Sequence, residues 1–155
     1  MAAFTASTEA TEVQRKEGEI LAIPMMNNVK IFKGDLVLAD ATTGTARPVY
    51  GTGTTGDKFM GVAMESVDNT LTGHEEAGKS VRVYRTSSFL FTKASAAIAD
   101  IGTAMYTDVS AAGTPTTVIA AASKASFVGM VTEYIDATHV RVQINTGDIL
   151  NLGAA

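Results

Sequence analysis

The stretch KFMGVAMESVD at Lys58–Asp68 occurs a second time, as SFVGMVTEYID at Ser126–Asp136. Aligned residues of the two copies, such as Gly61 and Gly129, stand 68 positions apart. A glycine in mid-strand usually marks a bulge or a close approach of another backbone, so the same bend is expected in both copies. A self-similar stretch of this kind predicts a supersecondary unit that buries its apolar face against its twin.

The similarity continues on both sides of this stretch. Upstream, GDLVLAD and GTAMYTD keep the same offset. Downstream, SVRVYRT at Ser80–Thr86 corresponds to HVRVQIN at His139–Asn145, which arrives nine residues sooner, as a shorter loop between two strands would allow. The chain is therefore predicted to contain two tandem strand repeats, at about residues 29–91 and 100–148, with Phe59 and Phe127 in equivalent buried positions.

Composition narrows the classes of protein. The 155 residues suit a single domain, with a core large enough to fold unaided. The absence of cysteine excludes disulfides, thiolate metal sites and thiol nucleophiles. A net charge of -4 argues against nucleic acid as a partner. No apolar run is long enough to cross a membrane, and no secretory leader is recognisable, so the chain is expected to remain in the cytoplasm where it is made.

The apolar pattern predicts a mainly β protein. In Val29–Asp40 apolar and polar residues alternate at period 2, with a break at Lys33-Gly34, and similar short runs recur between turn signals. Only the alanine-rich stretch Ala94–Ile101 favours a helix, of one or two turns. We expect a compact barrel or sandwich built from the two repeats, with at most one short helix.

The first 18 residues form a region that differs in composition from the rest of the chain. They are polar and aperiodic, which predicts either a disordered tail or an extended N-terminal arm that lies on a partner, ahead of a single β domain at residues 19–155. Phe4 and Val13 are the sizeable apolar side chains of the arm, so they are the expected contacts with that partner or with a neighbouring copy. At the other end, Ile149–Ala155 is expected to be a loose tail.

One nucleotide-binding motif is formally complete. Gly73–Ser80 fits the phosphate-binding pattern G-x-x-x-x-G-K-S, which requires a strand before it and a helix after it. Here the pattern runs into a strand instead. Glu75 and Glu76 would also lie in the cradle and repel phosphate. We expect a polar hairpin loop and no nucleotide binding.

The remaining polar residues give no catalytic or metal-binding pattern. The two histidines, His74 and His139, lack the spacing of a metal site, and no G-x-S-x-G motif is present. The pairs Glu65/Glu133 and Asp68/Asp136 are best explained by solvated strand faces and turn capping, although a symmetric carboxylate pair is the alternative. We expect no enzyme activity, no cofactor and no metal.

The order of these segments carries a family resemblance. Over about residues 29–144, the chain resembles the capsid decoration or structural cement proteins of tailed phages. The segments that carry the resemblance are, in order, KIFKGDLVLAD, FMGVAMESVDNT, SVRVYRTSSFLF, IGTAMYTD and HVRVQI. That family is mostly β, has no catalytic site, commonly assembles as trimers and clamps the outer capsid lattice.

The resemblance implies a function and partners. The expected protein is a structural component of the virion, bound to the major capsid protein on the outer surface of a phage head, and in contact with its own copies as a homotrimer. Many weak contacts would then add through multivalency. The alternative is a carbohydrate- or ligand-binding β module displayed on the virion surface. Neither function involves nucleic acid or a membrane.

Overall fold

The structure, a computed structural model, describes residues 20–50, 56–71, 75–110, 113–120 and 125–145. Strands make up 52% of the described residues, which contain no helix beyond a single 3-10 turn. The mainly β fold predicted from the sequence is therefore confirmed; the sheets are compatible with a sandwich, and no closed barrel forms. The elements are β1 (Ile20–Pro24), β2 (Lys30–Ile31), β3 (Leu36–Ala39), β4 (Ala46–Pro48), β5 (Lys58–Ala63), β6 (Val67–Asp68), β7 (Ser80–Tyr84), β8 (Thr86–Thr92), η2 (Ile98–Asp100), β9 (Ala104–Thr107), β10 (Val118–Ile119), β11 (Phe127–Asp136) and β12 (His139–Asn145).

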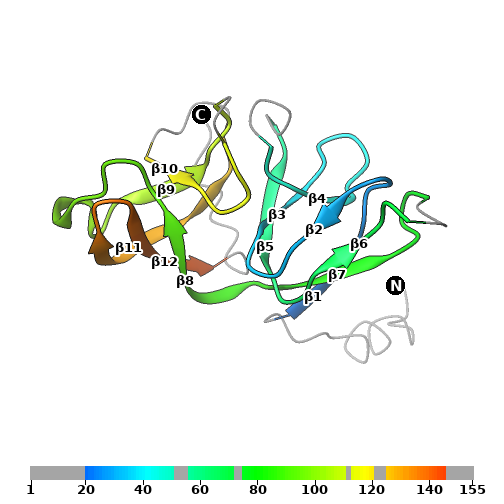
Figure 1. Cartoon of the computed structure of the whole chain (residues 1–155), viewed down its shortest axis with the longest axis horizontal. Coiled ribbons are helices and arrows are strands. Elements are labelled where there is room, and N and C mark those ends of the chain that lie inside the picture. The colour runs from blue at the N-terminus through cyan, green and yellow to red at the C-terminus, as the bar shows by residue number, and fades with distance from the viewer. Residues whose placement is uncertain (1–19, 51–55, 72–74, 111–112, 121–124, 146–155) are drawn as a thin grey trace, which may run out of the picture.

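Two five-stranded antiparallel sheets account for most of these strands. The first sheet has the order β1-β7-β5-β3-β4 and the second the order β8-β12-β11-β9-β10, while β2 and β6 form a separate two-stranded ribbon. The sheets lie side by side in Figure 1, and one continuous ribbon runs from β7 into β8. Arg85 alone separates these two strands, so the chain leaves one sheet directly into the other.

The two sheets share their register as well as their order. In the first sheet Val37 stands opposite Gly61, and in the second Met105 stands opposite Gly129. In both strand pairs the register shifts at the next residue, which is Leu38 in the first sheet and Tyr106 in the second. The 68-residue offset also relates β1 to β8, because Ile23 faces Val81 as Phe91 faces Val140.

The predicted bend at the paired glycines has a common cause. A Cβ added to Gly61 would lie 2.2 Å from the carbonyl oxygen of Tyr84, and one added to Gly129 would lie 2.0 Å from that of Gln143. Each glycine therefore lets a neighbouring backbone approach more closely than any side chain would allow.

Each sheet has two faces, which we call front and back. The front face carries Val81 and Val83 in the first sheet and the corresponding Val140 and Val142 in the second. Alternation along the strands places Leu36, Leu38, Phe59 and Val62 on the back of the first sheet, and their counterparts Ala104, Tyr106, Phe127 and Met130 on the back of the second.

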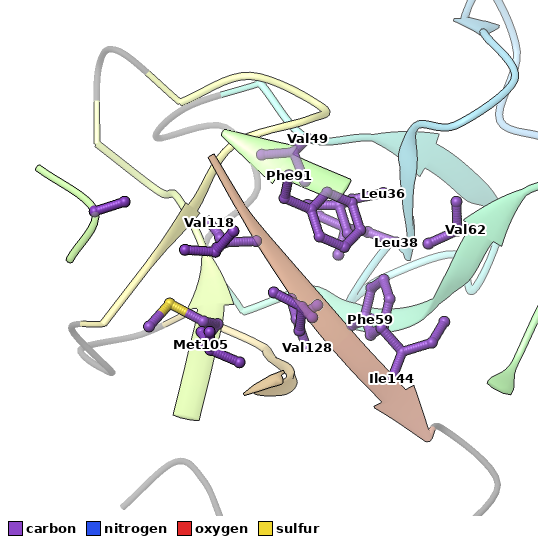
Figure 2. Close-up of a cluster of buried hydrophobic side chains, with 14 residues drawn as sticks. Leu36, Leu38, Val49, Phe59, Val62, Phe91, Met105, Val118, Val128 and Ile144 are labelled. Carbon is purple, nitrogen blue, oxygen red and sulfur yellow. The ribbon is translucent and has the colours of Figure 1, made fainter. Parts of the chain in front are cut away.

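The main core lies between the back of the first sheet and the front of the second. Figure 2 shows Phe91 of β8 beside Leu36 and Leu38 of β3, with Val118 and Ile144 in the same cluster. A second cluster fills the front of the first sheet, where Ile31 of the ribbon joins Val81 and Val83. The two units therefore stack front to back rather than face to face.

The structure changes two details of the sequence reading. Residues 87–91, which the repeat bounds placed in the first half, pair with β12 and belong to the second sheet. Phe59 and Phe127 hold equivalent strand positions, opposite Leu38 and Tyr106, but only Phe59 is buried. Phe127 is half-buried because it lies on the second sheet's back face, where its ring meets Tyr106 edge-on at 5.8 Å between centroids.

Candidate functional site

The residues proposed from the sequence as partner contacts, Phe4 and Val13, lie outside the described residues, as does the rest of the predicted arm. So does the loose tail predicted at Ile149–Ala155. The candidate site is therefore sought on the described surface.

The nucleotide-like segment leads into a strand, as the sequence predicted. Ser80, its last residue, is the first residue of β7. The Lys79 ammonium donates to the backbone oxygen of Asp68 at 2.7 Å, and the Thr45 hydroxyl donates to the Glu76 carboxylate at 3.1 Å. Both side chains thus contact the protein's own loops. Gly73 and His74 lie outside the described residues.

The paired glutamates do not form a shared carboxylate site. Glu65 receives the guanidinium of Arg82 at 3.1 Å, and Glu133 receives that of Arg141 at 3.0 Å. Both ion pairs lie on the surface, but only Glu133 lies on a strand, β11, whereas Glu65 lies in the bend between β5 and β6. The Arg82 hydrogen bonds hold the pKa of Glu65 below its usual range.

The paired aspartates cap turns, as predicted. Asp68 accepts the Thr70 backbone N–H at 2.8 Å, and Asp136 accepts that of Thr138 at the same distance. The Thr138 amide, with a contribution from His139, lowers the pKa of Asp136 to about 2. His139 is a surface turn residue whose Nδ1 lies 2.9 Å from the Asp136 carboxylate. No cluster of three or more possible metal ligands occurs within the described ranges.

Three exposed isoleucines of the second half lie at one end of its sheet. Ile98 on η2 is 70% exposed, Ile101 just after it is 49% exposed, and Ile135 near the end of β11 is 39% exposed. We call these three residues the isoleucine surface. Figure 1 shows the loop before β9 projecting beyond the sheet at this end, next to the turn between β11 and β12.

Hydrogen bonds hold this loop against the hairpin. The backbone N–H groups of Lys93 and Ala96 donate to the carbonyls of Thr138 and Ala137, each at 2.9 Å. Further along, the N–H of Gly102 donates to Val131 of β11 at 2.8 Å. The exposed isoleucines are thus carried on backbone fixed at both ends.

Asp100 organises the single helical turn. Its carboxylate accepts the N–H of Ala97 at 2.8 Å and pairs with the Lys93 ammonium at 3.1 Å. The Ala97 amide, followed by Lys93, lowers the pKa of Asp100 from its ordinary value. This capping explains why a turn of three residues persists where the sequence offered only a short alanine-rich stretch.

A second feature is a shallow cleft where the two sheets diverge. It has a volume of about 460 Å³ and is lined by Ile20, Tyr84, Thr86, Ser87 and Phe89. The Tyr84 and Phe89 rings lie 5.8 Å apart in a tilted arrangement. Ser87 has a φ of 111°, an unusual value for a residue other than glycine, at the point where the chain changes sheets.

Sequence reasoning identified neither feature. Ile98 and Ile101 were read only as part of a helical candidate, and the signal available was that their spacing fits no period-2 strand. The cleft brings Ile20 against residues 84–89, and only the pairing of β1 with β7 creates this arrangement. No helix among the described residues is long and apolar enough to cross a membrane.

No protein-family model, curated protein or solved structure matches the chain.

Proposed function

We propose that this chain is a structural protein of a phage head, which binds the outer surface of the capsid and stabilises its lattice. The order of its sequence segments, which resembles that of capsid decoration proteins, supports the proposal. The structural observation that carries it is the isoleucine surface, an exposed aliphatic group on hydrogen-bonded backbone.

The geometry of this surface suits protein binding. Ile98, Ile101 and Ile135 are exposed, yet the loop around them is already ordered by its hydrogen bonds to the hairpin. Binding would then cost little additional backbone entropy. Full burial of one isoleucine side chain contributes about 1.5–3 kcal/mol, so three partly exposed ones could supply a modest contact per copy.

A modest contact per copy is sufficient if copies are linked. In the proposed arrangement the chain forms a homotrimer, and each copy contacts the major capsid protein. The N-terminal arm, with Phe4 and Val13, adds contacts to the capsid or to a neighbouring copy. Linked weak sites raise the effective concentration of one another, so attachment becomes strong without any single large interface.

The matching sheets support a tandem duplication as the origin of the chain. Order, register and the 68-residue offset agree between β1, β3 and β5 of the first unit and β8, β9 and β11 of the second. The corrected units begin at β1 and β8. Under this proposal, one five-stranded module was copied, and the second copy later lost nine residues from the loop before its last strand.

The capsid proposal is tested by co-sedimentation with capsids assembled from the major capsid protein of the same phage. The wild-type chain is expected to pellet with capsids. Ile98→Asp should reduce the bound fraction at least about tenfold, because it places a charge in a desolvated contact. Circular dichroism checks that the variant is folded.

Leu71→Asp is the matched control. Leu71 is also largely exposed, at 60%, but it lies in the first half of the chain. This variant should bind capsids like the wild type. Failure of the wild-type chain to bind capsids contradicts the proposed function, while equal losses in both variants contradict the assignment of the isoleucine surface.

The cleft favours the alternative, a ligand-binding module on the virion surface. Two adjacent rings and two hydroxyl side chains could receive a small molecule with an apolar face and polar groups. A glycan array probed with the labelled chain and with Tyr84→Ala tests it. Binding that the variant abolishes would favour this function over capsid attachment.

A further inference from the structure

The back face of the second sheet is the one major sheet face that the described chain leaves without a partner sheet. Met130 on this face is 48% exposed, and Ala104, Tyr106 and Phe127 are half-buried. In the first sheet the matching residues are Val62, Leu36, Leu38 and Phe59, all of them buried in the main core. The back face is therefore covered in the first sheet and left open in the second.

The first unit shows how such a face is covered. The chain leaves its last strand, β7, and enters β8 at once. Seven residues after Tyr84, the end of β7, stands Phe91, which packs beside Leu36 and Leu38 on the back face (Figure 2). The segment that immediately follows the unit is thus the segment that supplies a large apolar side chain to its back face.

The second unit continues in the same way. Gln143 of β12 corresponds to Tyr84, because both carry the carbonyl that contacts the paired glycine. Seven residues after Gln143 stands Leu150, within TGDILNLGAA at residues 146–155. These residues lie outside the described ranges. Their apolar side chains, Ile149, Leu150 and Leu152, begin only four positions after the end of β12.

We propose that residues 149–152 of the same chain dock on the back face of the second sheet, with Leu150 taking the place there that Phe91 takes on the first sheet. Charge agrees with this choice of occupant. The sequence just before Ile20, QRKEGE, is highly charged, whereas ILNL carries no charge.

Reach also allows this occupant. Seven extended residues span up to about 23–25 Å, which the first unit shows to be enough to cross from the last strand to the back face.

The chain has no cysteine, so a single introduced thiol can report on the face. Met130→Cys is prepared in the full chain, in a chain ending at Asn145, and together with Leu150→Asp. The rate of alkylation by iodoacetamide is measured for each. The full chain should react about tenfold more slowly than the other two, because a segment docked for nine-tenths of the time shields the thiol for that fraction.

Leu71→Cys in the same three backgrounds is the control. Its thiol, in the first half of the chain, should react at one rate throughout, which also shows that truncation leaves the fold intact. The point variant Leu150→Asp keeps the test decisive if the truncated chain fails to fold. Equal rates for the Met130→Cys thiol in the full chain and in the Leu150→Asp variant would overturn the proposal.

The source of the occupant is tested by dilution. Docking within one chain predicts the same protection at every protein concentration. Protection that disappears on dilution would show that a second copy covers the face, and it would overturn the assignment to the chain's own segment. Protection that survives both Leu150→Asp and truncation would identify another part of the chain as the cover, with the same consequence.

Discussion

The two sheets differ in what covers their apolar front faces. Both have an apolar front face, made in part by Val81 and Val83 in one and by Val140 and Val142 in the other. The β2–β6 ribbon covers the first front face, whereas the first sheet itself covers the second. A shared backbone register therefore does not decide what a sheet packs against; the segments between the strands do.

The segment that makes the difference lies between β1 and β3 in the first unit and between β8 and β9 in the second. In the first unit it forms β2, which pairs with β6. In the second unit the corresponding residues form η2, and the strand matching β5 and β6 continues without a break as β11. Without a ribbon of its own, the second front face is free to receive the first sheet, and Ile98 is left exposed.

A second difference lies at the margin of the main core. Arg47 of β4 pairs with the buried Asp57 at 2.5 Å, and both side chains are almost fully covered. By register and offset, the second sheet has Ile119 and Ala125 at these positions. One unit thus holds a buried ion pair where the other holds apolar side chains, and this contrast can be measured.

The largest expected effects are at the paired glycines. Gly61→Ala and Gly129→Ala should each lower the free energy of unfolding by about 3–5 kcal/mol, since the new methyl group would overlap a backbone carbonyl that cannot move alone. Urea denaturation followed by circular dichroism measures both.

Gly44→Ala is the control for this pair. Gly44 also has a positive φ, 72°, but a Cβ there meets no atom within 4 Å, so only about 1 kcal/mol should be lost. A loss of similar size at Gly61 and Gly129 would mean that close backbone approach is not what the two sheets share.

The buried ion pair should give the next largest effect. Asp57→Asn leaves the Arg47 guanidinium without its closest charged partner and should cost about 3 kcal/mol. The double variant Arg47→Ile with Asp57→Ala gives the first sheet the residue types that the second sheet has at these two positions. It should recover part of that loss, as measured by urea denaturation. A double variant no more stable than Asp57→Asn would show that the two margins are not interchangeable.

The back faces should differ less strongly. Val62→Ala removes two methyl groups from the main core and should cost about 2 kcal/mol. Met130→Ala, at the corresponding position of the second sheet, should cost less than about 1 kcal/mol because the side chain is half exposed. Thermal unfolding of the two variants gives the comparison. Equal costs would contradict the front-to-back stacking of the units.

The smallest effect concerns the Asp136 turn. The pKa of Asp136 is about 2 in the folded protein, below its ordinary value of 3.8, so folding favours the ionised form. Its contribution to stability is present above about pH 4 and is lost as the pH falls toward 2. Asp136→Asn should therefore flatten the fall of Tm between pH 4 and pH 2. Parallel Tm curves for the variant and the wild type would contradict this assignment.

Sequence reasoning recovered the β class and the positions of most strands, because alternation at period 2 is local. It also found the paired turns at Asp68 and Asp136, since an aspartate two residues before a threonine caps its own loop. The predicted repeat bounds place residues 87–91 in the first half, whereas the structure pairs them with β12. EILAIP and SSFLFT share no identities at the 68-residue offset, although β1 and β8 hold matching places in their sheets.

The packing of the sheets could not be read from the sequence. Phe59 and Phe127 are the same residue type at equivalent positions, yet one lies in the core and the other on a half-exposed face. Which face a partner covers depends on tertiary contacts, and these are set by the β2–β6 ribbon and its absence in the second unit. The isoleucine surface was missed for the same reason, because exposure is a property of the whole fold.

The pairing of β1 with β7 has a consequence for synthesis of the chain. The first and last strands of the first unit are neighbours, so its sheet closes only once residue 84 has emerged from the ribosome. From then until β8 to β12 follow, the unit is complete on one side and has Leu36, Leu38 and Phe59 exposed on the other. Self-association would therefore begin among nascent chains in which only the first unit is complete. The speed of translation through β8 to β12 sets how long those chains exist.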